Sequence, residues 1–217
     1  MPQFSCILFD LDGTIVDSAP GITATLAYTF EQLRLPVPSP AELVAYVGPP
    51  ILDSFRDLAR FTPEQSQRAL EIYRVQYLKT GVFDATVYPG VADVLKAIRA
   101  HDVPLSLATS KPETPATLIL EHYDLLKYFD VITGASDDEK RSAKADVVEE
   151  ALKRLTEHGA DISRPVMVGD RHHDVVGAAA HEVPTIFVRW GYGAPAEEVG
   201  TIGVVDSAAE LQRLLLG

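Results

Sequence analysis

A short apolar segment that ends in two aspartates constrains this chain more than any other feature. Residues 4–9 read Phe-Ser-Cys-Ile-Leu-Phe, a run typical of a strand buried in a parallel sheet. Asp10 and Asp12 follow this run. They would lie at the carboxyl end of the strand, which is where open α/β folds bind their ligands. Two carboxylates this close repel each other unless a proton or cation lies between them. The segment therefore predicts a site for an oxygen-seeking divalent cation such as Mg2+. A surface turn is the alternative, because Asp and Gly also favour turns.

The same arrangement recurs late in the chain. Residues 165–168 form a second short apolar run, and Asp170 and Asp174 follow it. Four residues correspond to about one turn if a helix begins there. A turn and a helix N-cap would also explain these two aspartates taken alone. Two acidic strand ends in one chain favour a functional site over two unrelated turns.

Two further segments lie between these aspartates. Residues 103–108 read as a strand and lead into Thr109 and Ser110, whose hydroxyls and following amides could cradle an anion at the start of a helix. Lys144 begins a predicted helix over residues 144–157, where a positive charge opposes the helix dipole. An ordinary capping turn and a solvated lysine are the alternatives.

Together these four segments resemble the haloacid dehalogenase-like superfamily of phosphotransferases. The first motif is Asp10-Leu11-Asp12-Gly13-Thr14, the second contains Thr109, and the fourth spans residues 169–174. In many relatives the lysine of the third motif stands in a Lys-Pro-x-Pro-Asp run. This chain instead has the Lys-x-x-Val pattern of another branch, which favours Lys144 over Lys140. The resemblance covers nearly the whole chain in the expected order.

The resemblance implies a phosphatase that works through a covalent intermediate. Asp10 would attack phosphorus and form an aspartyl-phosphate. Asp12 would protonate the leaving oxygen and then take a proton from the attacking water. Thr109 would donate a hydrogen bond to the phosphoryl oxygens, and Lys144 would offset their charge.

The resemblance also implies a Mg2+ cofactor. Asp10, the backbone carbonyl of Asp12 and the carboxylate of Asp170 would bind it, and Asp174 would act through a metal-bound water or orient its neighbours. The expected substrate-binding residues are Gly13, Thr14 and Ser110.

The pattern of elements predicts an α/β fold, a Rossmann-like, doubly wound parallel sheet. Residues 17–84 break the strand–helix alternation with proline-punctuated helical patterns. A helical insertion after a catalytic strand end is expected to act as a lid, and the resemblance implies a small all-helical cap. The predicted division is a core of residues 1–16 and 85–217 and a cap of residues 17–84. Core strands are expected at 4–9, 103–108, 130–133, 165–168, 185–188 and 202–205, and core helices at 90–100, 114–122, 144–157, 174–181 and 207–215.

Composition narrows the expected partners. The net charge of −12 argues against a nucleic-acid-binding face. No apolar run is long enough for a membrane helix, and the N-terminus does not read as a signal peptide. Cys6 is the single cysteine and is expected to fill the core of a cytoplasmic protein. The sequence does not indicate an oligomeric state.

Within the superfamily that this chain resembles, an aspartate at the position of Asp12 is typical of a phosphatase or a phosphomutase. Sugar phosphomutases of this type carry an arginine in the first cap loop, whereas residues 47–50 here read Val-Gly-Pro-Pro. We therefore expect a phosphatase of the phosphoglycolate-phosphatase-like branch, acting on a small soluble phosphomonoester. Phosphoglycolate, nucleotides and sugar phosphates all remain open as substrates. The alternatives are a phosphomutase of the β-phosphoglucomutase type and a catalytically idle ligand-binding protein of the same fold.

Overall fold

A parallel six-stranded sheet forms the centre of the protein in our computed structural model, which describes residues 3–138 and 140–217. Its strand order is β5-β4-β1-β6-β7-β8. Because β1 pairs with β4 on one side and β6 on the other, the strand order reverses beside β1. The predicted α/β fold class is confirmed. The strands are β1 (Cys6–Phe9), β4 (Leu105–Pro112), β5 (Val131–Ala135), β6 (Pro165–Gly169), β7 (Thr185–Val188) and β8 (Gly203–Val205).

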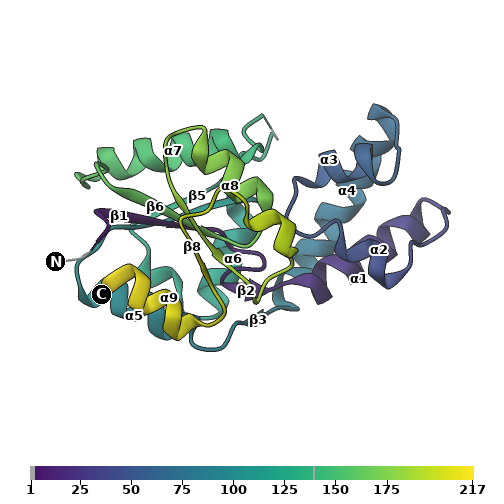
Figure 1. The fold of residues 1–217 in the computed structure, drawn as a ribbon. Helices are drawn as coiled ribbons and strands as arrows, with labels where there is room; N and C mark the ends of the chain where they lie inside the picture. The colour runs from purple at the N-terminus through teal and green to yellow at the C-terminus, as the bar shows by residue number, and fades with distance from the viewer. Residues whose placement is uncertain (1–2, 139) are drawn as a thin grey trace.

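Helices cover both faces of this sheet (Figure 1). Helices α7 (Lys144–Glu157) and α8 (His172–Ala179) pack on one face, and α5 (Val91–Ala100), α6 (Glu113–His122) and α9 (Ala208–Leu216) pack on the other. Strand β1 serves both layers because successive side chains point to opposite faces. Cys6 and Leu8 join the cluster beneath α7, and Ile7 and Phe9 join the opposite cluster.

Most predicted elements are present with ends shifted by one or two residues, and two of the differences lie at the candidate site. The segment from Thr109 to Pro112 was expected at a helix start, but it continues β4, because pairing with β5 resumes at Pro112 after an irregular stretch. Helix α8 begins two residues earlier than predicted, at His172. The reason is that the Asp174 carboxylate accepts the backbone N–H groups of Asp170 and Arg171 and so caps the first turn.

A helical insertion occupies the chain between two very short strands. Strands β2 (Val16–Asp17) and β3 (Thr86–Val87) pair antiparallel, and a two-residue strand has no period that a sequence could reveal. The insertion has its own aromatic core, in which Phe55 packs against Phe61 and Tyr73. Its helices are α1 (Ala19–Gln32), α2 (Pro40–Val44), α3 (Ile51–Asp57) and α4 (Pro63–Lys79), followed by the 3-10 turn η1 (Gly81–Phe83). Two further 3-10 turns, η2 (Leu126–Tyr128) and η3 (Pro195–Glu198), lie outside the insertion.

Tyr192, in the loop after β7, fixes the start of the insertion. Its hydroxyl accepts hydrogen bonds from the backbone N–H groups of Ser18 (2.8 Å) and Ala19 (3.0 Å) and donates one to Asp17 (2.7 Å). These amides lie at the first turn of α1, where no helical partner exists for them. Tyr192 therefore supplies the cap that α1 lacks. Within the described residues, no helix combines the length and apolarity that a membrane crossing requires.

Replacing this hydroxyl should weaken the fold. We expect Tyr192→Phe to lower the free energy of unfolding by about 1–3 kcal/mol, because three hydrogen bonds, to two amides and one carboxylate, are lost. Urea denaturation followed by circular dichroism measures this change. Tyr28→Phe, at a side chain that is 38% exposed, is the matched control and should leave the midpoint unchanged. Equal stability of Tyr192→Phe and the parent protein would contradict the capping role.

Candidate active site

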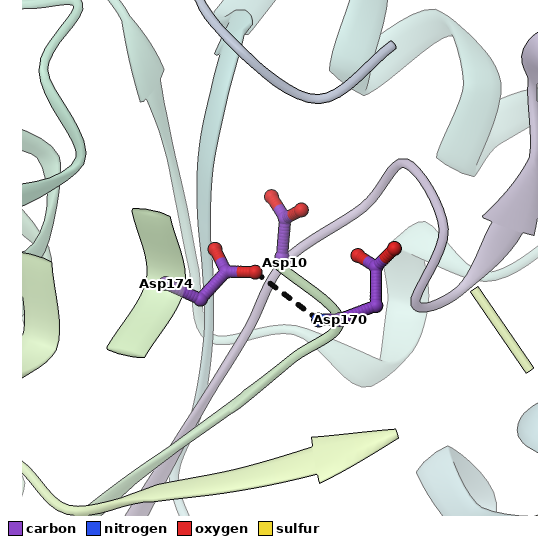
Figure 2. A group of neighbouring side chains, drawn as sticks. All are labelled: Asp10, Asp170 and Asp174. Atoms are coloured by element: carbon purple, nitrogen blue, oxygen red, sulfur yellow. Dashed lines mark hydrogen bonds between the residues drawn. The ribbon is translucent and has the colours of Figure 1, made fainter. Parts of the chain in front are cut away.

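Three carboxylates converge at the carboxyl ends of the two central strands (Figure 2). Asp10 follows β1, Asp170 follows β6, and Asp174 lies in the first turn of α8. All three are buried, and each offers a carboxylate oxygen within 4.8 Å of the others. They meet because β1 and β6 pair in register, with Phe9 opposite Val168. Within residues 3–138 and 140–217, no histidine or cysteine belongs to this cluster.

Burial and nearby negative charge make Asp170 and Asp174 hold protons more tightly than usual. Removal from water, followed by the charges of Asp174 and Asp10, raises the pKa of Asp170 well above its usual range. Burial also raises the pKa of Asp174 to about 6, although Lys144 opposes this shift. Three acids with oxygen donors at one point suit a hard divalent cation such as Mg2+, which would replace the protons.

Lys144 is the ammonium group that faces this cluster. Its Nζ lies 2.8 Å from Asp10 Oδ1 and 2.8 Å from Asp174 Oδ1, and it donates to the Ala108 carbonyl at 3.0 Å. Burial alone would lower the pKa of Lys144, but Asp10 and Asp174 outweigh it and the pKa is raised. Lys140, the rejected alternative, is solvent-exposed and pairs with Asp138.

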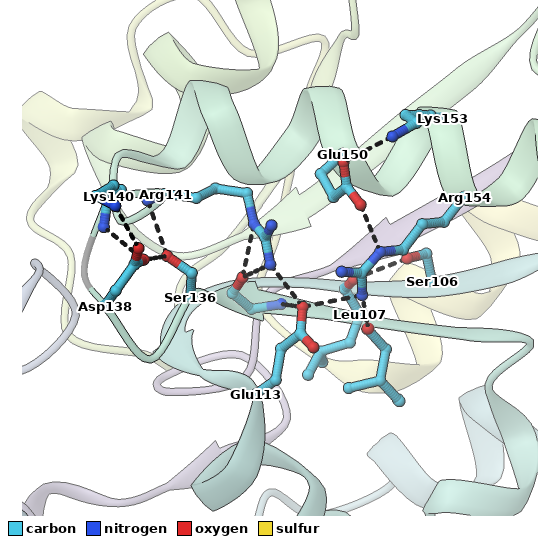
Figure 3. A network of polar contacts seen from close by, with 12 residues as sticks. Ser106, Leu107, Glu113, Ser136, Asp138, Lys140, Arg141, Glu150, Lys153 and Arg154 are labelled. Atoms are coloured by element: carbon cyan, nitrogen blue, oxygen red, sulfur yellow. Dashed lines mark hydrogen bonds and ion pairs between the residues drawn. The ribbon is translucent and has the colours of Figure 1, made fainter.

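A network of charged side chains fixes the helix that carries Lys144 (Figure 3). Glu113, directly after β4, accepts hydrogen bonds from Arg141 at 2.8 Å and lies 2.9 Å from Arg154 Nη1. Arg154 also binds Glu150 one turn earlier on α7. The loop before α7, α7 itself and the end of β4 are thereby joined, which limits how far Lys144 can move from Asp10.

Asp12 lies in a second buried ion pair. Its Oδ2 is 3.0 Å from Lys111 Nζ, and its Oδ1 accepts a hydrogen bond from the Ser18 hydroxyl. Lys111 also donates to the Tyr77 hydroxyl of α4 at 3.0 Å. Burial opposes the charge of Lys111, but Asp12 and then Tyr77 and Tyr73 raise its pKa. No role was expected for Lys111, although it stands within the second motif.

Gly13 and Thr14 both contact Asp170. Gly13 has a φ of +82°, and a Cβ at this position would lie 2.2 Å from Asp170 Oδ2, so a side chain cannot be accommodated there. Thr14 Oγ1 donates to Asp170 Oδ1 at 3.2 Å, and the Tyr192 amide donates to Oδ2 at 2.7 Å. The loop after β1 and the loop after β7 thus hold the Asp170 carboxylate in place.

Thr109 and Ser110 lie at the end of β4, one strand away from Asp10. Both are buried. Thr109 Oγ1 accepts a hydrogen bond from the Lys111 amide at 3.2 Å. Ser110 Oγ has no hydrogen-bond partner among the described residues. A buried hydroxyl without a partner can bond to a bound ligand.

A cavity of about 330 Å3 opens beside Asp12, between the sheet and the helical insertion. We call it the insertion chamber. Ser110 and Lys111 line it from the sheet side, whereas Arg56 and Lys79 do not line it. Most of its wall comes from the insertion: Ile22, Tyr46, Gly48, Pro49, Ile51, Leu70, Tyr73, Arg74, Tyr77 and Leu78.

Comparison with known proteins relates this site to a hydrolase family. A family model described as haloacid dehalogenase-like hydrolase matches residues 7–188. The chain is 38% identical to a tyrosine-protein kinase PtkA of Mycobacterium tuberculosis, over 96% of this chain and 70% of that protein. It is 32% identical to a 5'-nucleotidase of Pseudomonas aeruginosa, over 90% and 87% of the two chains. The solved structure of a predicted phosphatase from Clostridium acetobutylicum superposes with a TM-score of 0.90 at 35% identity, covering 97% of each chain. Curated matches also include phosphoglycolate phosphatases.

Metal binding at the carboxylate cluster should weaken on acidification. Because the pKa of Asp174 is raised to about 6 and that of Asp170 is also raised, protons compete with the cation below that pH. We expect the dissociation constant for Mg2+ to be about tenfold larger near pH 5 than near pH 7. Isothermal titration calorimetry measures it directly. Asp174→Asn should make the Mg2+ affinity depend less on pH. Equal affinity of the parent protein at both pH values would contradict the prediction.

Proposed function

This chain belongs to the haloacid dehalogenase-like hydrolase family, and on that premise we propose that it hydrolyses small phosphomonoesters through an aspartyl-phosphate on Asp10. Its family membership and its relatives identify it as a phosphatase-type enzyme. The observation that carries the proposed mechanism is the 2.8 Å contact between Asp10 and Lys144 inside a cluster of buried carboxylates. The Lys144 ammonium lies against the carboxylate that would act as nucleophile, where it can offset negative charge during the attack on phosphorus.

The first step would transfer the phosphoryl group to Asp10. A carboxylate oxygen of Asp10 forms a bond to phosphorus while the bond to the leaving oxygen breaks. Asp12 donates a proton to that oxygen. In the second step water attacks phosphorus, Asp12 takes the proton, and Asp10 and inorganic phosphate separate. The proximity of Asp12 to the insertion chamber supports this assignment, since the leaving group must lie beside the acid.

Charge neutralisation would fall to Lys144, to Thr109 and to a metal ion. Asp10, Asp170 and Asp174 fit Mg2+ by their donor chemistry, and the carbonyl of Asp12 would complete the protein ligands. The bound ion would offset the repulsion between Asp10 and the incoming phosphate. Lys144 would meet the phosphoryl oxygens that approach Asp10, and Thr109 would donate its hydroxyl to them. Gly13 and Thr14 would complete the phosphate site, and Ser110, which lines the insertion chamber, would bind the substrate beside it.

The helical insertion would act as a cap over residues of the core. We propose the division into a cap of residues 17–84 and a core of residues 1–16 and 85–217. Contacts that cross this boundary near the chemistry support it. Tyr77 binds Lys111, and Arg171 donates to the Val47 carbonyl at 2.7 Å. A cap that contacts the core beside the reacting groups can enclose the substrate and open to release product.

A second candidate activity is phosphoryl transfer to tyrosine. It is favoured by one observation, the 38% identity to a protein named tyrosine-protein kinase PtkA. Incubation with labelled ATP separates the two activities, because an aspartyl-phosphate is cleaved by hydroxylamine and a tyrosyl phosphate is not. Stable label on tyrosine would favour the kinase.

Glucose 1-phosphate tests the phosphomutase, which would yield an isomer in place of free phosphate.

Replacing the nucleophile should abolish turnover. We expect Asp10→Asn to lower kcat by at least about a thousandfold, because an amide cannot form the covalent intermediate. Phosphate release is measured from phosphoglycolate, nucleoside monophosphates, hexose phosphates and an aryl phosphate, with Mg2+ and with EDTA. Circular dichroism checks that the variant is folded. Parent-like release by Asp10→Asn would overturn the assignment, and no release by the parent protein would favour an idle binding protein.

The two candidate lysines of the third motif give a matched pair of variants. Lys144→Ala should lower kcat by about a hundredfold or more, since a buried charge that faces Asp10 is lost. Lys140→Ala should retain parent activity, because its side chain is 86% exposed and binds Asp138. Steady-state kinetics on the best ester measures both. A large loss in Lys140→Ala alone would show that the third motif is misplaced.

A further inference from the structure

The insertion chamber is larger than the smallest candidate leaving groups require. Its volume of about 330 Å3 falls at the lower end of the range for ligand pockets, roughly 300–1,000 Å3. A glycolate group has only a few heavy atoms and would leave most of this space to water. A leaving group with a ring system fills it far better. The chamber begins at Asp12, where the leaving oxygen would be protonated.

Flat aromatic surfaces form one wall of the chamber. Tyr73 and Tyr77, one turn apart on α4, stack with ring centroids 5.4 Å apart and an interplanar angle of 8°. Tyr73 also packs edge-on against Phe55, so the stack is held in place before any ligand arrives. Tyr46 and Leu70 add further apolar surface. Walls of this kind favour a planar ring, which can stack or pack against them.

The formal charges around the chamber cancel. Asp12 pairs with Lys111 at 3.0 Å, and Arg74 donates to the Asp137 carbonyl at 3.0 Å, so two acids and two cations line the space. Among the described residues that line the chamber, no surplus positive charge is available to attract a carboxylate or a second phosphate on the leaving group. The net charge of −12 on the whole chain also disfavours an additional anion. A neutral leaving group fits better.

Several polar groups of the chamber wall already have partners within the protein, among them Asp12, Lys111 and Tyr77. Ser110, which is 7% exposed, lines the chamber with a hydroxyl that has no partner among the described residues. This group can anchor one polar atom of a ligand. A hexose carries several hydroxyls, and an apolar wall would leave most of them without hydrogen bonds.

We propose that the insertion chamber selects phosphomonoesters whose leaving group is uncharged and carries a planar aromatic ring, such as a nucleoside or a phenol. This inference rests on the proposed function, because it names the substrate class of the same site. The ring would lie against the wall of Tyr46, Leu70 and Tyr73, because Tyr77 already stacks on Tyr73 and has the Lys111 ammonium 4.6 Å from its ring centroid. One polar atom would bond to Ser110. Carboxylate-bearing and sugar esters would be poor substrates.

Matched pairs of esters test the inference. AMP and ribose 5-phosphate differ only by the base, and phenyl phosphate and phosphoglycolate differ in ring and charge. We expect kcat/KM to be at least about tenfold higher for the ring-bearing member of each pair, which corresponds to about 1.4 kcal/mol. A preference for AMP alone would identify the kind of ring and still support the inference. A preference for phenyl phosphate alone would overturn it, because phenoxide is a better leaving group than an alkoxide and reacts faster without a ring site. Equal or reversed values in both pairs would overturn it and leave the phosphatase intact.

Binding separates failure of this inference from failure of the proposed function. Calorimetry with Asp10→Asn measures the affinity for AMP and for ribose 5-phosphate without turnover. If no ester releases phosphate, the proposed function fails, and tighter binding of AMP still supports the chamber as a ring site. Equal affinities would overturn the ring site independently of catalysis.

Variants of the wall locate the effect. Tyr73→Ala should lower kcat/KM for AMP about tenfold and change that for ribose 5-phosphate less than about twofold. Val75→Ala, on the same helix and 73% exposed, is the matched control and should change neither. If Tyr73→Ala does not fold, Leu78→Glu tests the same wall from a position that is 42% exposed. Equal losses on both esters in the folded variant would contradict a ring-specific wall.

Discussion

The surrounding structure must compensate four buried carboxylates at one edge of the sheet, which only two buried lysines oppose. Lys144 pairs with Asp10 and Asp174, Asp170 lies in the same cluster, and Asp12 pairs with Lys111. Burying this much negative charge is costly unless each group is paired. The surrounding structure supplies the pairing: the amides before α8 bind Asp174, and Thr14 and the Tyr192 amide bind Asp170. One ammonium against three acids leaves an excess of negative charge that a divalent cation would offset.

The same charges connect the helical insertion to the sheet. Lys111 binds Asp12 and the Tyr77 hydroxyl together, so the second motif and α4 meet at one ammonium group. Tyr192 binds both the start of α1 and, through its amide, Asp170. Any movement of the insertion therefore acts on the residues around the proposed acid and the proposed metal site. This coupling is what a cap that encloses a reaction requires.

Much of the site could be predicted from the sequence because the end of a buried strand has a recognisable local pattern. An apolar run followed by Asp10 or Asp170 is visible without coordinates, and parallel strands bring such ends to one edge. Lys144 was selected over Lys140 by the motif pattern, and Lys144 is the one that meets Asp10. Lys111 was missed because a lysine after a strand resembles a solvated charge. Its burial depends on Asp12 and Tyr77, which are distant in the sequence.

The sequence by itself determined the fold class, the order of strands and helices, and the residue types at each strand end, because hydrophobic period and turn chemistry are local properties. The tertiary structure alone decided which charges neutralise one another, where β4 ends and what the wall of the insertion chamber is made of. Those features arise where segments far apart in the chain meet: β4 with β5, Lys111 with α4, and Tyr192 with α1. Pairing across such distances follows from packing, and no local pattern of residues encodes it.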